Sequence, residues 1–219
     1  MKLQCSKCSK HGLGFLSKHI LPHQFIEGNP IADILIIGLN PKNEIGTVEN
    51  RTSEELRDFD PDCHPYFSDF KKVSPKLYQN WKSEKSTIAH TDLIKCFSKT
   101  FPPRHFEKEN KINVDQVIDH CSEHLLNQIR TGKPRLLICN GSKVCWEIMR
   151  LFPPPMENYD PKTLTSYRAS QNIDGIDYPF WVVLSGFIGR IDDRNKRRLG
   201  MEVEGVLERE GIELAQRTK

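Results

Sequence analysis

The chain has 219 residues, of which 37% are hydrophobic and 28% are charged, and its formal net charge at pH 7 is +3. This composition excludes an intrinsically disordered chain, and the small net charge excludes a polycation, so a nucleic-acid-binding surface has to be a local patch. The length fits one medium-sized domain, and we expect residues 1–219 to form a single domain.

The sequence carries no sign of a membrane or an export route. No apolar run approaches the roughly 18 residues needed to cross a bilayer, and the opening MKLQCSKC lacks the apolar segment of a secretory signal. We therefore expect a cytoplasmic monomer without a membrane partner. Seven cysteines, an odd number, favour metal ligation or free thiols over a disulfide framework.

The chain begins with a C-x-x-C pair, Cys5 and Cys8, and two further cysteines, Cys96 and Cys121, stand far along the sequence. Thiolates select zinc or iron–sulfur clusters over hard cations, and either centre needs four ligands. Such separated pairs can close a centre only if the fold brings them together. The sequence thus indicates a soft-metal site and leaves cluster and zinc open.

Four short apolar runs predict buried strands, because each is continuous rather than alternating, as in parallel strands covered on both faces. These runs are Ile34–Leu39, Ile88–Ile94, Leu136–Cys139 and Phe180–Leu184. Strands that alternate with helices predict a parallel sheet whose ligand site lies beyond the carboxyl ends of the strands. The expected helices are Tyr66–Trp81, Val114–Arg130, Ser142–Phe152 and a terminal helix within Asp192–Lys219.

Three segments are expected to be surface loops, because they are polar, bounded by proline or rich in turn formers. They are Asn43–Pro65, Thr100–Asn110 and Pro153–Asp177.

The first predicted strand runs into a G-L-N-P turn at Gly38–Pro41. Glycine permits close backbone approach, proline fixes its own φ, and the Asn40 amide between them can hold a water or a substrate carbonyl. The alternative is an ordinary Asn-Pro turn without a chemical role.

Three segments, in this order, resemble the iron–sulfur members of the uracil-DNA glycosylase superfamily. ADILIIGLNPK at Ala32–Lys42 resembles their first motif, in which a strand ends in a Gly-x-(acid or Asn)-Pro turn. HTDLIKCFSKTFPPR at His90–Arg104 is similar to a strand that ends in Thr-Asn-x-x-Lys-Cys before a Pro-Pro loop. The segment Cys121–Met149 resembles the family's Cys-x-x-x-Leu helix, Lys-Pro, strand and Gly-containing helix start. The resemblance extends from Cys5 to about Arg198.

This resemblance implies a three-layer α/β/α domain around a central four-stranded parallel sheet. It also implies a structural four-iron four-sulfur (4Fe-4S) cluster bound by Cys5, Cys8, Cys96 and Cys121. A zinc ion held by the same four thiolates remains the alternative.

The resemblance further implies a DNA glycosylase, which extrudes a nucleotide, holds the base edge and hydrolyses the N-glycosidic bond through an oxocarbenium-like state. By analogy, Asn40 orients the attacking water, Phe67 stacks on the flipped base and Gly38 lies against that base. The alternative for Phe67 is that it forms the apolar face of a helix with Tyr66 and Phe70.

Two positions depart from the family pattern. Asp92 stands where the family has an Asn that reads the uracil edge, and an ionised carboxylate repels a carbonyl, so the preferred base need not be uracil. Leu184, Ser185 and Gly186 replace the family's His-Pro-Ser loop, so the histidine that stabilises the departing base is missing there. We keep Ser185 as a candidate catalytic residue that also engages the DNA backbone.

A basic run follows this loop and is expected to contact DNA phosphates, with Phe187 or Ile188 inserted as a wedge. The alternative is a solvated helix face, since Asp192 and Asp193 dilute the positive charge. The residues expected at the phosphates are Arg190, Arg194, Lys196 and Arg197.

The expected function is removal of uracil or another deaminated or damaged base from DNA. Two alternatives stay open: a catalytically inactive iron–sulfur relative that binds nucleic acid, and a zinc-stabilised α/β protein without a DNA role. His64 and His90, the histidines nearest the expected cleft, are expected to be structural.

Overall fold

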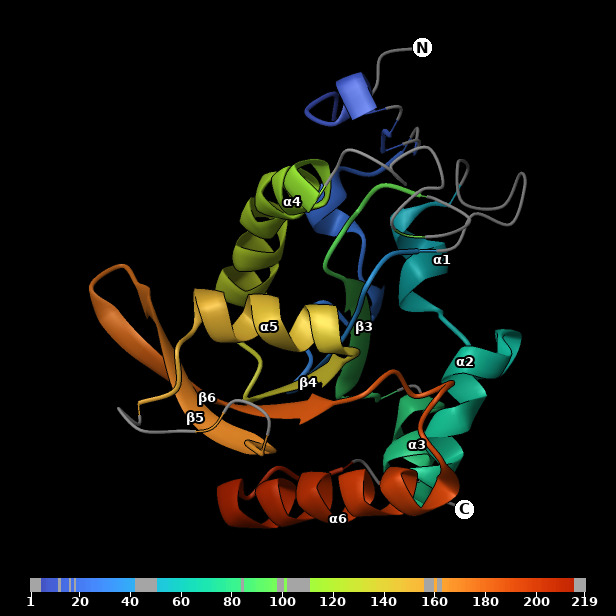
Figure 1. Cartoon of the computed structure of the whole chain (residues 1–219). Helices are drawn as coiled ribbons and strands as arrows, with labels where there is room; N and C mark the ends of the chain where they lie inside the picture. Colours follow the sequence, from blue (N-terminus) through green and yellow to red (C-terminus); the bar gives the residue numbers. More distant parts are fainter. Residues whose placement is uncertain are drawn as a thin grey trace.

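The computed structural model describes residues 5–41 except 12, 16 and 18, residues 51–97 except 84, residue 101, residues 111–155, residue 160 and residues 163–214. Within this part of the chain a mixed sheet of six strands has the order β1-β3-β2-β4-β6-β5 (Figure 1). The strands are β1 (Glu27–Gly28), β2 (Ile34–Gly38), β3 (Ile88–Asp92), β4 (Leu136–Asn140), β5 (Ser166–Ile173) and β6 (Ile176–Ser185).

The inner strands β3, β2, β4 and β6 pair in parallel, whereas β1 and β5 pair antiparallel at the two edges. The expected α/β class is confirmed, with a mixed sheet of six strands in place of the four expected. All four predicted strands are present near their predicted positions. Every residue of β2, β3 and β4 is buried, including the polar residues His90, Thr91, Asp92 and Asn140 at the carboxyl ends of β3 and β4.

The sheet is covered by helices on both faces (Figure 1). Leu35 and Ile37 of β2 pack with α4 and α5, whereas Ile34 and Ile36 of the same strand pack with α3 and α6. Successive residues of a strand point to opposite faces, so one apolar strand serves two cores. The α-helices are α1 (Ser53–Arg57), α2 (Pro65–Ser68), α3 (Pro75–Trp81), α4 (Lys111–Gly132), α5 (Ser142–Leu151) and α6 (Asp193–Glu210).

The prediction of one helix over Tyr66–Trp81 is wrong. The segment forms α2, a 3₁₀ turn at Asp69–Lys72 and then α3. The break has a local cause: Ser74 has an extended backbone and its Oγ accepts a hydrogen bond from the Leu77 N–H, with Pro75 at the first helical position. The other three predicted helices are confirmed as α4, α5 and α6.

The predicted loop Pro153–Asp177 is wrong over its second half, where β5 and the start of β6 form a hairpin. Residues along β5 alternate between buried and exposed, and Asp174 and Gly175 at the turn have φ of 53° and 86°. An Asp-Gly turn of this kind is a strong hairpin signal that composition alone conceals.

The other two expected loops are described only in part. The predicted loop Asn43–Pro65 contains α1, whose N-cap Thr52 forms a capping box with Glu55, while its residues 43–50 lie outside the described residues. Of the predicted loop Thr100–Asn110, only Phe101 is described.

None of the helices within the described ranges is both long enough and apolar enough to cross a membrane.

Helix α6 approaches the segment before α3 so closely that Gly200 allows no side chain, because an added Cβ would collide with the Val73 carbonyl oxygen. We expect Gly200→Ala to destabilise the protein by about 2 kcal/mol through overpacking. Gly205 of the same helix has nothing within 4 Å of its Cβ position. Gly205→Ala should therefore raise the stability by about 0.5–1 kcal/mol, as for a helix-interior glycine. Urea denaturation measures the free energy of unfolding of both variants. Changes of the same sign in the two variants would contradict this packing.

Candidate functional site

The carboxyl ends of the parallel strands bring three of the residues singled out in the sequence to one edge of the sheet. Gly38 of β2 stands opposite Asp92 of β3, and Ser185 of β6 stands opposite Asn140 of β4. Parallel strands end at the same edge, which is where ligands bind in open α/β sheets. Asn40 follows two residues after the end of β2.

Two polar side chains approach the backbone of Gly38 so closely that they leave no room for a side chain there. A Cβ at this position would collide with Asp92 Oδ1 and would lie 2.9 Å from His90 Nε2. His90 and Asp92 are two residues apart on β3 and therefore point to the same face. Only glycine lets both polar groups converge on the end of β2.

Asp92 is the buried carboxylate of this edge, with 4% of its surface exposed. Its backbone carbonyl accepts a hydrogen bond from Lys95 Nζ, whereas no hydrogen bond reaches its carboxylate within the described ranges. Burial raises the pKa of Asp92 from 3.8 to about 6, and the charges of His90 and Lys95 oppose the rise. The carboxyl group therefore changes protonation state close to neutral pH.

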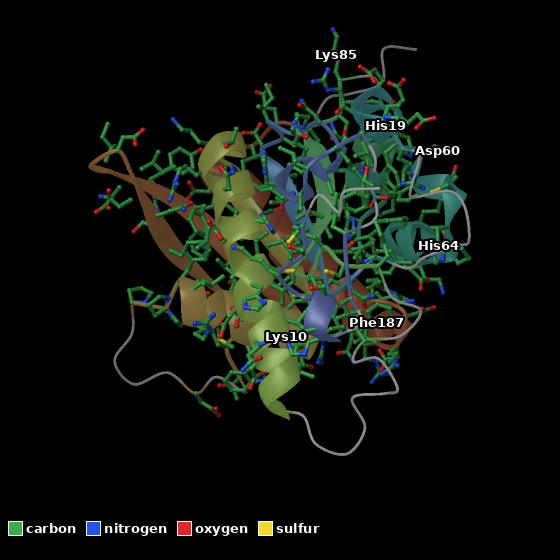
Figure 2. All side chains as sticks on the ribbon, turned by 90° about the horizontal axis from the view of Figure 1, so that it is seen from above. Lys10, His19, Asp60, His64, Lys85 and Phe187 are labelled. Atoms are coloured by element: carbon green, nitrogen blue, oxygen red, sulfur yellow. The ribbon has the colours of Figure 1, made fainter. Side chains whose placement is uncertain are left out.

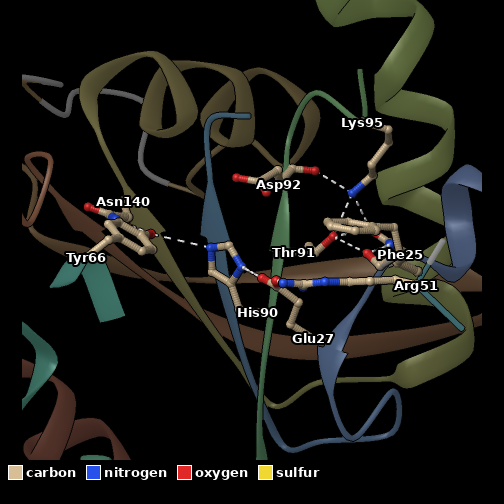
Figure 3. A network of polar contacts seen from close by, with 10 residues as sticks. Phe25, Glu27, Arg51, Tyr66, His90, Thr91, Asp92, Lys95 and Asn140 are labelled. Carbon is tan, nitrogen blue, oxygen red and sulfur yellow. Dashed lines mark hydrogen bonds and ion pairs between the residues drawn. The ribbon is translucent and has the colours of Figure 1, made fainter. Parts of the chain in front are cut away.

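His90 is held from the edge strand β1 (Figure 3). Its Nδ1 lies 2.8 Å from Glu27 Oε2, and Arg51 Nη1 donates to Glu27 Oε1 at 2.9 Å. An ionised carboxylate only accepts hydrogen bonds, so His90 Nδ1 carries the hydrogen. His90 Nε2 is then the nitrogen that accepts, and the Tyr66 hydroxyl lies 3.4 Å from it.

Asn140 continues this chain of contacts to the loop after β6. Its Nδ2 donates to the Tyr66 hydroxyl and its Oδ1 accepts from the Ile188 N–H at 2.7 Å. The rings of Tyr66 and Phe187 stack with an interplanar angle of 14° and centroids 5.8 Å apart. Burial raises the pKa of Tyr66 above its usual range, so the hydroxyl stays protonated and can donate.

Sequence reasoning missed Glu27, Tyr66 and Asn140 as members of this site and treated His90 as structural. Asn140 could have been found, since it ends a predicted buried strand at the ligand-bearing edge. Glu27 lies on a two-residue strand that no periodicity reveals.

Phe67 lies in an aromatic cluster rather than at the open edge. It is 8% exposed and packs edge-on against Phe59, Trp81 and His90, with ring centroids 4.7, 5.5 and 4.9 Å away. This location favours the alternative in which Phe67 belongs to an apolar helix face. Tyr66, its neighbour, is the ring that contacts the polar chain.

Asn40 and Ser185 both lie near the edge and both make local hydrogen bonds. Asn40 is half-buried and its Nδ2 donates to the Pro41 carbonyl at 3.2 Å. The Ser185 hydroxyl donates to the Gly186 carbonyl at 2.8 Å. The hydrogen bonds given for the Tyr66–His90 pair run to Asn140 and Glu27.

The basic segment is divided by the structure. Arg190, Arg194 and Arg197 are exposed, and the Arg190 guanidinium lies 5.9 Å from the centre of the Phe187 ring. Lys196 is instead 5% exposed and forms an ion pair with Asp69 at 2.9 Å, so it attaches α6 to the body of the protein.

Of the two expected wedge residues, Ile188 is fully buried and Phe187 is 39% exposed. Phe187 is therefore the one that can reach a ligand, and it is labelled in Figure 2.

Three of the four expected metal ligands meet in the structure. Cys8, Cys96 and Cys121 are buried, and contacts among the three thiols raise the pKa of Cys8 and Cys96 and lower that of Cys121. The Lys95 N–H donates to Cys121 Sγ at 3.5 Å. Cys5 is half-buried and close enough to act electrostatically on Cys8. Sulfur atoms gather beside α4 in Figure 2.

This donor set fits a soft metal centre in kind, because it combines sulfurs from three distant segments with a backbone N–H aimed at one of them. In the part of the chain that the structure describes, no group of three or more His, Cys, Asp or Glu side chains is arranged, as it stands, to hold a metal ion. Cys139 and Cys145 are buried packing residues and Cys63 is exposed.

A cavity of about 390 Å³ lies elsewhere, lined by residues of α1, α4 and the segment before β1. His23, Arg57 and Asn127 are among its lining residues, and it includes none of the positions assigned to catalysis or base contact. Its location therefore gives no support to those assignments.

No protein-family model matches this chain, and the comparison with curated proteins finds no match.

Because the pKa of Asp92 is raised in the folded state, the free energy of unfolding should depend on pH. A carboxyl group whose pKa is higher in the folded state binds more protons there, so stability is lost as pH rises from about 4 to about 6. Asp92→Asn removes this loss and should be more stable than the parent protein above pH 6, by about 1–3 kcal/mol, and equally stable below pH 4.

Urea denaturation at several pH values measures this difference. Asp174→Asn, at the exposed hairpin turn, is the matched control, because Asn also tolerates a left-handed backbone. A stability difference for Asp92→Asn that does not change between pH 4 and pH 7 would rule out the burial effect.

Proposed function

We propose that this protein is a hydrolase of the uracil-DNA glycosylase superfamily that removes uracil or another deaminated or damaged base from DNA. The proposal includes the three-layer α/β/α arrangement around the parallel strands, a single domain over residues 1–219 and a four-iron four-sulfur cluster. It also takes DNA as the partner of a cytoplasmic monomer.

One observation carries the proposal. Segments that resemble the family's motifs in order also converge in space, because Gly38, Asp92 and Asn140 end three neighbouring parallel strands at the same sheet edge. The separated thiols of Cys8, Cys96 and Cys121 meet as the same resemblance requires. Two independent groups of residues thus agree with one family pattern.

Base excision requires water to bond to the sugar C1′ while the C1′–N bond breaks and its electron pair leaves with the base. Asn40 would orient that water, since an amide can donate and accept hydrogen bonds but cannot take a proton. The water proton therefore passes to solvent or to the departing base. Such a site favours bases that leave easily.

Asp92 would contact the base edge, and its pKa of about 6 makes that contact depend on pH. An ionised Asp92 accepts from the N–H groups of a base, whereas a protonated Asp92 donates to a carbonyl. The preference for carbonyl-rich bases such as uracil or xanthine should therefore grow as pH falls through 6. A preference that stays constant between pH 5 and pH 8 would remove Asp92 from base reading.

Exposed Arg190, Arg194 and Arg197 would contact phosphates, and Phe187 would fill the space left by the extruded nucleotide. A cluster bound by the four cysteines would fix the segment after β3 against the N-terminal segment, a structural role.

A second function, a catalytically inactive relative that binds nucleic acid, is favoured by one observation. Asn40 cannot act as a base and the Asp92 carboxyl is 4% exposed, so the edge has no exposed proton acceptor among the residues assigned to it. The excision assay below separates the two functions.

Asn40→Ala should lower the excision rate at least about 100-fold while leaving DNA affinity within about twofold, since the amide acts on the water and not on the backbone. The assay uses single- and double-stranded oligonucleotides with one uracil, hypoxanthine, xanthine or mismatched base, followed by alkaline cleavage of abasic sites. Asn127→Ala, on the flank of α4, is the control. DNA binding without scission for any substrate would favour the inactive relative.

The cluster is tested by elemental analysis of protein prepared without oxygen. We expect about four iron and four sulfide per chain, reduced in Cys96→Ser and unchanged in Cys63→Ser, whose cysteine is exposed and outside the thiol group. One zinc per chain without iron would select the zinc alternative. Finding neither metal would contradict both.

A further inference from the structure

The loop after β6 has no histidine at this edge of the sheet, but strand β3 places His90 there. His90 is 3% exposed and lies on the same face as Asp92, beside Gly38. Its Nδ1 is fixed by Glu27, itself held by Arg51, so the ring has one defined orientation. A carboxylate on one ring nitrogen is the usual way in which proteins set the tautomer of a working histidine.

The other ring nitrogen lies against the end of β2 at Gly38, next to the Asp92 carboxylate. His90 Nε2 lies 2.9 Å from where a Cβ of residue 38 would be, and Asp92 Oδ1 borders the same space. Its contact with the Tyr66 hydroxyl, at 3.4 Å, is long for a hydrogen bond and is readily exchanged for a shorter one. Nε2 is thus the directed and weakly engaged group of the site.

The charged and titratable groups that face this imidazole come from each element packed against it. Glu27 lies on β1, Asp92 on β3 and Tyr66 on α2, with Arg51 behind Glu27. Two carboxyl groups and one phenol therefore surround a single imidazole. The arrangement can hold and deliver a proton.

We propose that His90 is the hydrogen-bond and proton donor to the departing base, with Glu27 as its positioning residue. This inference rests on the proposed base-excision function. In the neutral ring Nε2 carries no hydrogen, so the donor is the doubly protonated ring. As the C1′–N bond breaks, its electron pair moves onto the base and the Nε2–H proton of that ring follows to it. The attacking water releases its proton to solvent, from which His90 is reprotonated, so protons balance over one turnover.

The test measures single-turnover excision between pH 5 and pH 9 with the best substrate of the parent protein, and DNA affinity on the same oligonucleotides. His90→Gln should lower the excision rate about 100- to 10,000-fold, and its rate should no longer decline at high pH. Its DNA affinity should stay unchanged. Glu27→Gln should lower the excision rate about tenfold. Its rate should still decline at high pH, with the decline moved to a different pH. His19→Gln, at the exposed histidine labelled in Figure 2, should match the parent.

Two further measurements keep the outcome clear if His90→Gln folds poorly. Added imidazole should restore excision in His90→Ala in proportion to its concentration. Nitrogen-15 NMR should report the Nδ1–H tautomer of His90 in the parent protein and its loss of preference in Glu27→Gln.

The outcomes separate this inference from the function beneath it. If the parent protein excises a base while His90→Gln keeps its rate and pH profile, the role of His90 is wrong and the function stands. If the parent protein releases no base from any substrate, both fall.

Discussion

The parallel pairing of β2 with β3 is the contact on which the candidate site depends. It places Gly38 opposite Asp92 and thereby determines which side chains meet beyond the strands. A shift of the register by one residue would turn His90 and Asp92 to the α4 face and bring Thr91 to the opposite one. Strand β2 is apolar throughout and gives no alternation to set that register. Burial on both faces and the room that only Gly38 leaves set it instead.

Around this pairing the polar groups form one directed chain. Hydrogen bonds run from Arg51 to Glu27, from His90 to Glu27, from Tyr66 to His90 and from Asn140 to Tyr66. Both runs of donors end at Glu27, whose two carboxylate oxygens accept from Arg51 and from His90. The chain ties the edge strand β1, helix α2 and strand β4 to one imidazole.

The segment that follows β3 connects this edge of the sheet to the thiols of Cys8, Cys96 and Cys121. Lys95, 1% exposed, donates through Nζ to Thr91, Gln128 and the Asp92 carbonyl, and through its backbone N–H to Cys121. Between Asp92 and Cys96 there is one short, densely bonded segment. A metal centre at the thiols would therefore act on the position of Asp92 through covalent backbone and buried hydrogen bonds.

The sequence by itself determined the four inner strands β2, β3, β4 and β6, because a strand buried on both faces needs a largely apolar run wherever it lies in the fold. It also determined three of the helices, from their period. It did not determine the β5–β6 hairpin, because the many polar residues of that segment are also typical of a loop. It did not determine the partners of His90 either. Glu27 and Tyr66 stand 63 and 24 residues away from His90, and no local pattern links positions so far apart. Only the tertiary structure decided that meeting, because hydrogen bonds between distant side chains depend on strand register and helix placement, which the whole buried core sets together.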